Sequence, residues 1–193
     1  MKQVRYYIIF LVESEYNSKI PNKSKGTGLG IYVNKDFQFN RIDKFCCCTE
    51  NLEALFIEVT NLETPQFIGV IYHPPSGVLT EFYAELESLL TELPNQNVHI
   101  SGDFNIDLLS KNNNEFEHLI FEKNLIPTIS LATHEKPECT PSLIDNILIN
   151  STQNLNLSGI LKSKVSCHHP VFNIFTLNKN ATTDNQTKCP RYD

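Results

Sequence analysis

The stretch Ile100-Ser101-Gly102-Asp103-Phe104-Asn105-Ile106-Asp107-Leu108-Leu109 carries the strongest indication of the fold. An apolar, β-prone run ends on a Ser-Gly step, and a carboxylate and an amide follow at once. Since residues i and i+2 of an extended chain point the same way, Asp103 and Asn105 can face one pocket while Phe104 packs behind it. α/β sheets bind ligands at this end of their strands. The pairing indicates hydrolytic chemistry, although Asp and Asn after Gly are also common turn residues.

Length and composition indicate one globular domain with a real core. The chain has 193 residues, of which 40% are hydrophobic and 20% charged. We assign residues 1–178 to this domain and residues 179–193, which hold few apolar groups, to a polar tail. The formal net charge of −6 gives no overall attraction for nucleic acid, but a local basic patch could still hold phosphates. No pattern indicates an obligate protein partner.

The cysteines and the N-terminal run bear on the cellular compartment. Six cysteines are present, three of them consecutive at 46–48, and no C-x-x-C pair exists to form a zinc site. We read them as reduced thiols in a reducing compartment. The apolar run 6–12 is too short to cross a membrane and lacks a small-residue cleavage site after it. We therefore expect a β-strand there, no membrane partner, and an intracellular protein, nuclear or cytoplasmic, that is not secreted.

The pattern along the chain predicts mixed sheets with helices packed outside, an α/β (α+β) class. Apolar residues from Leu79 to Leu93 repeat at helical spacing and stop at Pro94, and a second helix is expected over 113–123. A glycine-rich segment, 26–30, leads into an expected strand at 31–33. Further strands are expected at the following ranges: 44–48, 53–60, 66–72, 98–100, 126–131, 143–149, 154–161 and 171–176.

Three more strand ends carry side chains that could do chemistry. Tyr72 ends an apolar run that two prolines stop. Asp145 lies within the apolar stretch 143–149, where a buried carboxylate needs a partner. His168 and His169 precede the last strand; each alone is also typical of a surface loop. An imidazole beside Asp145 would have its pKa raised, and in its charged form it could stabilise a phosphate or supply a proton.

These motifs together resemble the endonuclease/exonuclease/phosphatase family. Gly-Asp-Phe-Asn at 102–105, Ser-Leu-Ile-Asp at 142–145 and Ser-Cys-His-His-Pro at 166–170 are similar to its G-D-x-N, S-x-x-I-D and S-D-H-x-P motifs, in the same order and spacing. Within the family the resemblance is closest to the apurinic-endonuclease-like endonuclease domain of non-LTR retrotransposons. Ile-Tyr-His-Pro-Pro-Ser at 71–76 resembles their Y-R-P-P segment. The resemblance covers residues 16–177.

The resemblance implies a fold, a site and a cofactor. The fold would be a four-layer α/β sandwich with two mixed β-sheets flanked by helices. Asp103 would orient or deprotonate the attacking water and share in binding Mg²⁺, and Asn105 would hold the scissile phosphate. Tyr72 would contact that phosphate or assist the leaving group. Asp145 would pair with His168, whose imidazole would stabilise the transition state. The implied partner is DNA.

Two departures from the family pattern stand out. Cys167 occupies the position of the family's acidic residue beside the catalytic histidine, and a thiol is poorly suited to Mg²⁺. The family's first Asn-containing and Glu-containing strands, which supply the main metal carboxylate, are not found upstream of Gly26. Glu13 and Glu15 lie in that region but lack the family's flanking residues. We therefore expect a domain truncated at its N-terminus that lacks the family's first strands.

Several functions stay open at this point. The leading hypothesis is a Mg²⁺-dependent phosphodiesterase whose lineage nicks DNA for retrotransposition. A catalytically inactive remnant of the same fold is an alternative, because the metal-binding Glu motif is absent. A phosphodiesterase acting on small phosphoesters or sphingolipids is another. A Ser-His-Asp esterase using Ser101 or Ser166 is disfavoured, since no G-x-S-x-G motif is present.

Overall fold

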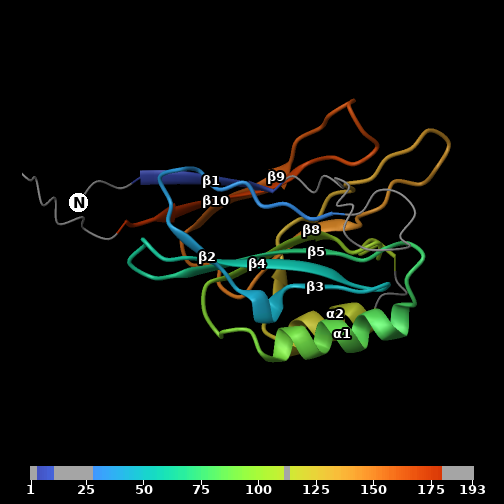
Figure 1. Ribbon diagram of the computed structural model, residues 1–193. Coiled ribbons are helices and arrows are strands. Elements are labelled where there is room, and N and C mark those ends of the chain that lie inside the picture. The colour runs from blue at the N-terminus through green and yellow to red at the C-terminus, as the bar shows by residue number, and fades with distance from the viewer. Residues whose placement is uncertain (1–3, 11–27, 111–113, 180–193) are drawn as a thin grey trace, which may run out of the picture.

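The computed structural model describes residues 4–10, 28–110 and 114–179, with residues 4–10 and 114 described by their backbone alone. Within these residues lie ten strands, two α-helices and one short 3-10 helix, arranged in two sheets and one helical layer (Figure 1). The elements are β1 (Val4–Phe10), β2 (Phe39–Arg41), η1 (Asp43–Phe45), β3 (Cys47–Cys48), β4 (Glu53–Val59), β5 (Gln66–Tyr72), α1 (Leu79–Thr91), β6 (Val98–Asp103), α2 (Asn114–Glu122), β7 (Ile126–Pro127), β8 (Asp145–Ile149), β9 (Leu155–Ile160) and β10 (Val171–Leu177).

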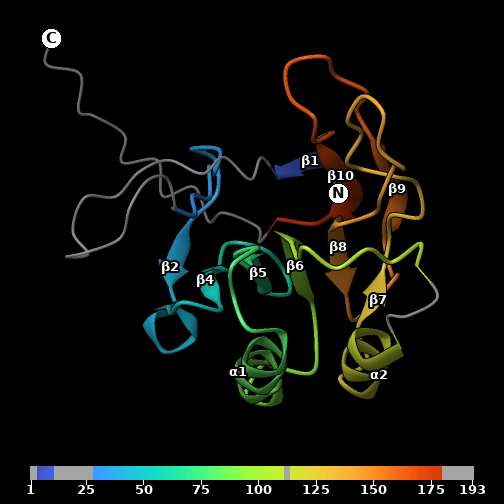
Figure 2. The same cartoon turned by 90° about the vertical axis from the view of Figure 1, so that its right-hand side faces the viewer.

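The larger sheet has seven strands in the order β2-β4-β5-β6-β8-β7, with β3 also paired to β4 (Figure 2). Strands β5 and β6 are parallel, and the remaining pairs are antiparallel, so this sheet is mixed. The segment between β5 and β6 contains helix α1, and this helix makes the parallel pairing possible. Helix α1 returns the chain to the starting end of the sheet, as a parallel connection requires.

The smaller sheet has three strands in the order β1-β10-β9, and both pairs are antiparallel. The expected N-terminal strand is present, with residues Val4–Phe10 paired along the whole of β10. The expected strand at 31–33 is not formed. Instead, Leu29, Ile31 and Val33 pack as irregular chain against the apolar cluster between the sheets. Their apolar alternation reflects burial on one side without strand pairing.

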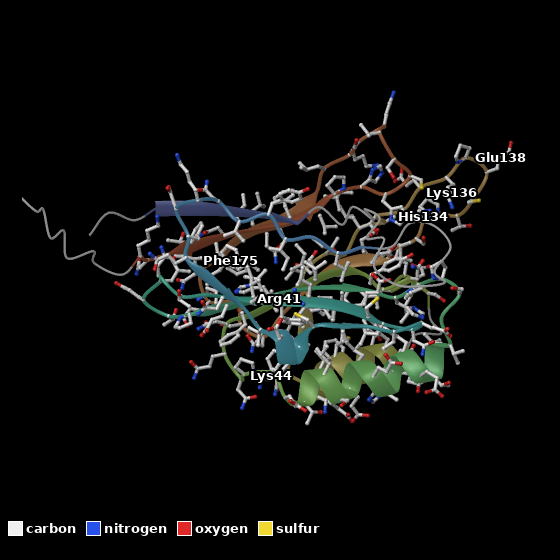
Figure 3. The ribbon with its side chains drawn as sticks, in the orientation of Figure 1. Arg41, Lys44, His134, Lys136, Glu138 and Phe175 are labelled. Atoms are coloured by element: carbon white, nitrogen blue, oxygen red, sulfur yellow. The ribbon has the colours of Figure 1, made fainter. Side chains whose placement is uncertain are left out.

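Two apolar clusters hold the layers together. One lies between the sheets and includes Ile147 and Phe175. Figure 3 shows Phe175 between the two layers of strands. The other lies between the large sheet and the helices and includes Leu148 and Phe116. Successive residues of β8 thus enter opposite clusters, as strand geometry requires. Both faces of this strand are buried, which explains its continuous apolar sequence.

Both described α-helices cover the same outer face of the large sheet, α1 and α2 side by side (Figures 1 and 2). Helix α1 buries Phe82, Tyr83, Leu86 and Leu90, the face expected from its periodicity, and it ends before Pro94. Helix α2 buries Phe116 and Ile120 completely.

The predicted α/β sandwich of two packed sheets with helices outside is confirmed, with three of its layers visible in the described residues. The larger sheet is mixed, and the smaller one is antiparallel throughout. The expected strand at 126–131 is short, since only Ile126–Pro127 pairs with β8. No helix in the described part of the chain has the length and apolar character needed to cross a bilayer. Glu13, Glu15 and residues 180–193 lie outside the described residues.

Candidate active site

Four polar side chains form a row across one end of the large sheet. Glu53 is paired in register with Tyr72, Tyr72 with Asp103, and Asp103 with Asp145. Val70 lies two positions before Tyr72 and Ile147 two positions after Asp145, and both belong to the cluster between the sheets. Directly paired residues share a face of the sheet, so the side chains of the whole row lie on that face. Glu53, Asp103 and Asp145 are buried. The row places three carboxylates and a phenol at the end of the sandwich.

The glycine before Asp103 is required by the close approach of β5. A Cβ atom at Gly102 would collide with the backbone carbonyl of Ile71. Only glycine lets the parallel strand β5 lie this close to β6. This close contact fixes the position of Asp103 relative to Tyr72. After the strand, Asn105 has a φ of 49°, a left-handed conformation that Asn tolerates better than most residues. Its backbone N–H donates to Asp103 Oδ1 at 3.0 Å and closes a turn that orients this carboxylate.

Two long connections carry further groups over the row. Residues 128–144 precede β8, and residues 161–170 join β9 to β10, so the second connection starts from the smaller sheet. Backbone hydrogen bonds join them: the His169 N–H donates to the Thr133 carbonyl at 2.7 Å, and the Glu135 N–H donates to the Cys167 carbonyl at 2.8 Å. Figure 3 shows His134 and Lys136 on the first connection, at one end of the sandwich.

The Asp145 carboxylate and the His168 imidazole form an ion pair. His168 Nδ1 lies 3.1 Å from Asp145 Oδ2 and 3.2 Å from Oδ1. This hydrogen bond raises the pKa of His168, with burial opposing it. The side chain of His168 remains 36% exposed while that of Asp145 is 10% exposed, so the imidazole can present Nε2 outward. His169 is buried elsewhere, 3.5 Å from Glu135, and does not reach the row.

Asp103 carries an unusual protonation equilibrium. Burial, and then the nearby charge of Asp145, raise the pKa of its carboxyl to about 6. The Asn105 N–H and the charge of His168 oppose this rise. The carboxyl is therefore ionised at neutral pH. Its raised pKa makes the carboxylate a stronger base than that of an ordinary Asp.

Asn105 is held by the segment that follows Tyr72. Its Nδ2 donates to the His73 carbonyl at 2.7 Å. The His73 ring is stacked on Phe82 at 4.2 Å, and its Nδ1 donates to the Phe104 carbonyl at 2.9 Å. One amide hydrogen of Asn105 is thus committed to positioning, and the amide has a second hydrogen that it can donate to a ligand.

Tyr72 lies between two carboxylates of the row. Burial raises the pKa of its phenol, and the charges of Asp103 and Glu53 raise it further. A phenol in this position keeps its proton at neutral and mildly alkaline pH. It can therefore donate a hydrogen bond to an anionic ligand.

The sequence motifs did not identify Glu53 or His134. Glu53 begins β4 and reaches the row only through strand pairing. The one feature that marks it in the sequence is its charge at the start of a largely apolar run. His134 lies in an irregular connection and forms an antiparallel bridge with His168. Its ring centroid is 4.7 Å from that of His168. Neither position has a local spacing that would connect it to the site before the fold is known.

Two groups of side chains within the described residues could each hold a metal ion. Ligand atoms of Asp103, Asp145 and His168 all lie within 4.8 Å of one another. The two buried carboxylates supply the oxygen ligands that Mg²⁺ prefers, and a cation would offset their mutual repulsion. His134, Cys167 and His168 form the second group at the same mutual distance. The first donor set fits a hard divalent cation, and the second is softer.

The fold is shared with solved structures of known proteins. No protein-family model matches the sequence, and no curated protein matches it either. The endonuclease domain of TRAS1, a telomere-specific non-LTR retrotransposon, is similar at a TM-score of 0.69 and 11% identity, over 90% of this chain and 80% of that one. The human Nocturnin catalytic domain with bound sulfate is similar at a TM-score of 0.53 and 16% identity, over 90% and 73% of the two chains. The chain therefore shares the fold of these two proteins.

Proposed function

We propose that this protein is a Mg²⁺-dependent phosphodiesterase that nicks DNA. The observation that carries the proposal is the pair Asp145–His168 placed in contact range of Asp103, with ligand atoms within 4.8 Å. A buried carboxylate that raises the pKa of a half-buried imidazole, beside a second carboxyl whose pKa is about 6, provides both a cation and a base in one site.

Each residue of the site has a role that its environment supports. Asp103 in its ionised form accepts a proton from the attacking water or orients it. The His168 imidazolium, held by Asp145, donates from Nε2 to the phosphate oxygens as their charge increases. Asn105 and the protonated phenol of Tyr72 donate to the same phosphate. The leaving oxygen receives its proton from Tyr72, from His168 or from solvent.

Asp103 and Asp145 would hold the Mg²⁺ ion. When bound there, Mg²⁺ supplies Lewis-acid stabilisation of the negative charge on a phosphoryl oxygen. Cys167, in the position where the family motif has Asp, offers no oxygen ligand. We therefore propose a lower affinity for Mg²⁺ than a carboxylate at that position would give.

The choice of DNA as substrate rests on two observations. The fold matches that of a retrotransposon endonuclease domain over most of both chains. In addition, the two connections over the site carry cations that could contact a phosphate backbone despite the overall charge of −6. These cations are Lys136, Lys162 and Lys164, of which Lys162 also pairs with Glu135 at 3.3 Å.

A plasmid-nicking assay tests the proposal. We expect supercoiled DNA to be nicked with Mg²⁺ but not with EDTA. His168→Ala should lower the rate by about 10²- to 10³-fold, the effect of removing one donor to a developing anion. Tyr72→Phe should lower it less. Glu138→Gln, which changes an exposed carboxylate at the tip of the 128–144 connection, is the matched control and should retain the full rate.

Three outcomes would change the conclusion. No nicking by the wild-type protein under any Mg²⁺ concentration would favour an inactive remnant. Equal nicking by the wild type and His168→Ala would contradict the assigned site. Hydrolysis of bis-p-nitrophenyl phosphate or sphingomyelin without nicking would favour a small phosphoester or sphingolipid as substrate.

A further inference from the structure

A second donor cluster overlaps the candidate active site at one residue. It consists of His134, Cys167 and His168, which we call the thiol cluster. Their ligand atoms lie within 4.8 Å of one another, and all three side chains are half-buried. Cys167 is a free thiol. The cluster combines one sulfur with two imidazole nitrogens, a set of donors that differs from the carboxylates of the row.

The backbone holds the thiol cluster in place. His134 and His168 form an antiparallel bridge, and the Glu135 N–H donates to the Cys167 carbonyl at 2.8 Å. The members come from the two connections, 128–144 and 161–170, that cover the active-site row. These hydrogen bonds fix the backbone on both sides of the cluster, so only side-chain rotations are needed to bring the donor atoms together.

Each imidazole is oriented through one ring nitrogen. His168 Nδ1 is bonded to Asp145 at 3.1 Å, and His134 Nδ1 lies 3.3 Å from the Ser142 hydroxyl. The Nε2 atoms of both rings are therefore the ones left for a ligand. A histidine whose other nitrogen is held by a carboxylate or hydroxyl is the usual arrangement around a protein-bound metal, because it fixes the ring and its tautomer.

The donor chemistry selects the ion. Thiolate and imidazole together favour Zn²⁺, whereas Mg²⁺ requires oxygen ligands. With Zn–N bonds of about 2.0–2.1 Å and Zn–S bonds of about 2.3 Å, tetrahedral ligands lie about 3.3–3.6 Å apart. The ligand atoms of the cluster lie within 4.8 Å of one another, so binding requires the three side chains to move closer together to reach that geometry.

We propose that His134, Cys167 and His168 bind one Zn²⁺ ion, with a fourth position open to water or to a phosphate oxygen. Cys167 Sγ releases its proton to solvent on binding, and both imidazoles bind through neutral Nε2.

Occupancy would also affect the phosphodiesterase, a consequence that rests on the proposed function. His168 cannot bind Zn²⁺ through Nε2 and donate from the same nitrogen to a phosphate. Zn²⁺ should therefore inhibit Mg²⁺-dependent nicking by the wild-type protein. Cys167→Asp replaces the soft donor by a carboxylate and should be less sensitive to Zn²⁺.

Cobalt spectroscopy tests the site itself. Co²⁺ is added to the reduced full-length protein, and the probe is the near-ultraviolet charge-transfer band of a thiolate bound to Co²⁺. We expect this band at one equivalent, its loss on addition of Zn²⁺, and its absence in Cys167→Ser. Cys139→Ser is the matched control, because Cys139 is an exposed free thiol on the 128–144 connection. His134→Ala should keep the thiol but weaken Zn²⁺ binding, measured by calorimetry, by at least about tenfold.

The outcomes separate the two proposals. A wild-type protein without the charge-transfer band, or a band that persists in Cys167→Ser, overturns the zinc site. Loss of the band in Cys139→Ser, with circular dichroism unchanged, also overturns it. If the band forms as expected but the wild type nicks no DNA with Mg²⁺, the proposed function fails while the zinc site stands.

Discussion

The ionised Asp103 carboxylate costs the fold stability, and its replacement by Asn should make the protein more stable. Burial and then the charge of Asp145 raise its pKa from an ordinary value of 3.8 to about 6. A difference of about 2 pH units corresponds to about 3 kcal/mol at about 1.4 kcal/mol per unit. Because the pKa of Asp103 is higher in the folded state than in the unfolded state, the group does not lower the free energy of unfolding below pH 3.8. The free energy of unfolding decreases as the pH rises through about 6 and the folded carboxyl ionises.

Asp103→Asn removes this penalty with little structural change. The amide keeps an oxygen for the Asn105 N–H and can donate from its nitrogen toward Asp145 in place of the charge repulsion. We expect Asp103→Asn to be more stable than the wild type by about 1–3 kcal/mol at pH 8, or about 2–4 °C in Tm per kcal/mol. At pH 4 the two proteins should differ by less than about 0.5 kcal/mol.

Urea unfolding at pH 4 and pH 8, in EDTA to remove divalent cations, measures both values. Glu138→Gln is the control, since the exposed side chain at that position should give no pH-dependent difference. An Asp103→Asn protein that is equally stable as the wild type at pH 8, or less stable, would refute the reasoning. A carboxylate kept at a cost in stability is typical of a functional site.

Three further predictions follow from the packing and the ion pair. Gly102→Ala places a Cβ atom against the Ile71 carbonyl and should cost at least about 2 kcal/mol in urea unfolding, whereas Gly30→Ala, with nothing within 4 Å, should change stability by less than about 0.5 kcal/mol. Phe116→Ala, at a side chain that is 0% exposed, should lower the free energy of unfolding by about 3–5 kcal/mol. Phe121→Ala on the same helix, at a side chain that is 55% exposed, should lower it by less than about 1 kcal/mol. Equal losses would contradict the assigned core face of this helix. Asp145→Asn should lower the pKa of His168, because their hydrogen bond is the largest cause of its rise, and an NMR titration that shows no decrease would contradict the pairing.

Much of the fold follows from local patterns in the sequence. The period of Leu79 to Leu93 predicts α1 and its buried face, since apolar residues at helical spacing form one stripe that packs against the core. The strands at Glu53–Val59 and Gln66–Tyr72 lie where apolar runs end at turn residues. The expected strand at 31–33 was wrong because an apolar alternation can also pack against a core without pairing.

The site could be predicted only in part, for a physical reason. Asp103, Asp145 and His168 stand within recognisable motifs, so a resemblance finds them. Glu53 joins the row through the pairing of β4 with β5, and His134 through a bridge between two irregular connections. Such contacts depend on strand register and on the path of long loops, which no local pattern determines. The resemblance also implied His168 rather than His169 as the partner of Asp145, and His168 Nδ1 lies 3.1 Å from that carboxylate.

The nicking rate of Asp103→Asn with Mg²⁺ at pH 8 tests the central claim most directly, that the Asp103, Asp145 and His168 site cleaves phosphodiesters. Because this variant should be more stable than the wild type, a loss of activity cannot be attributed to unfolding. We predict a rate at least about 10³-fold below that of the wild type, since both the base and a Mg²⁺ ligand are removed. A rate within about threefold of the wild type, about 0.7 kcal/mol in activation free energy, would contradict the claim.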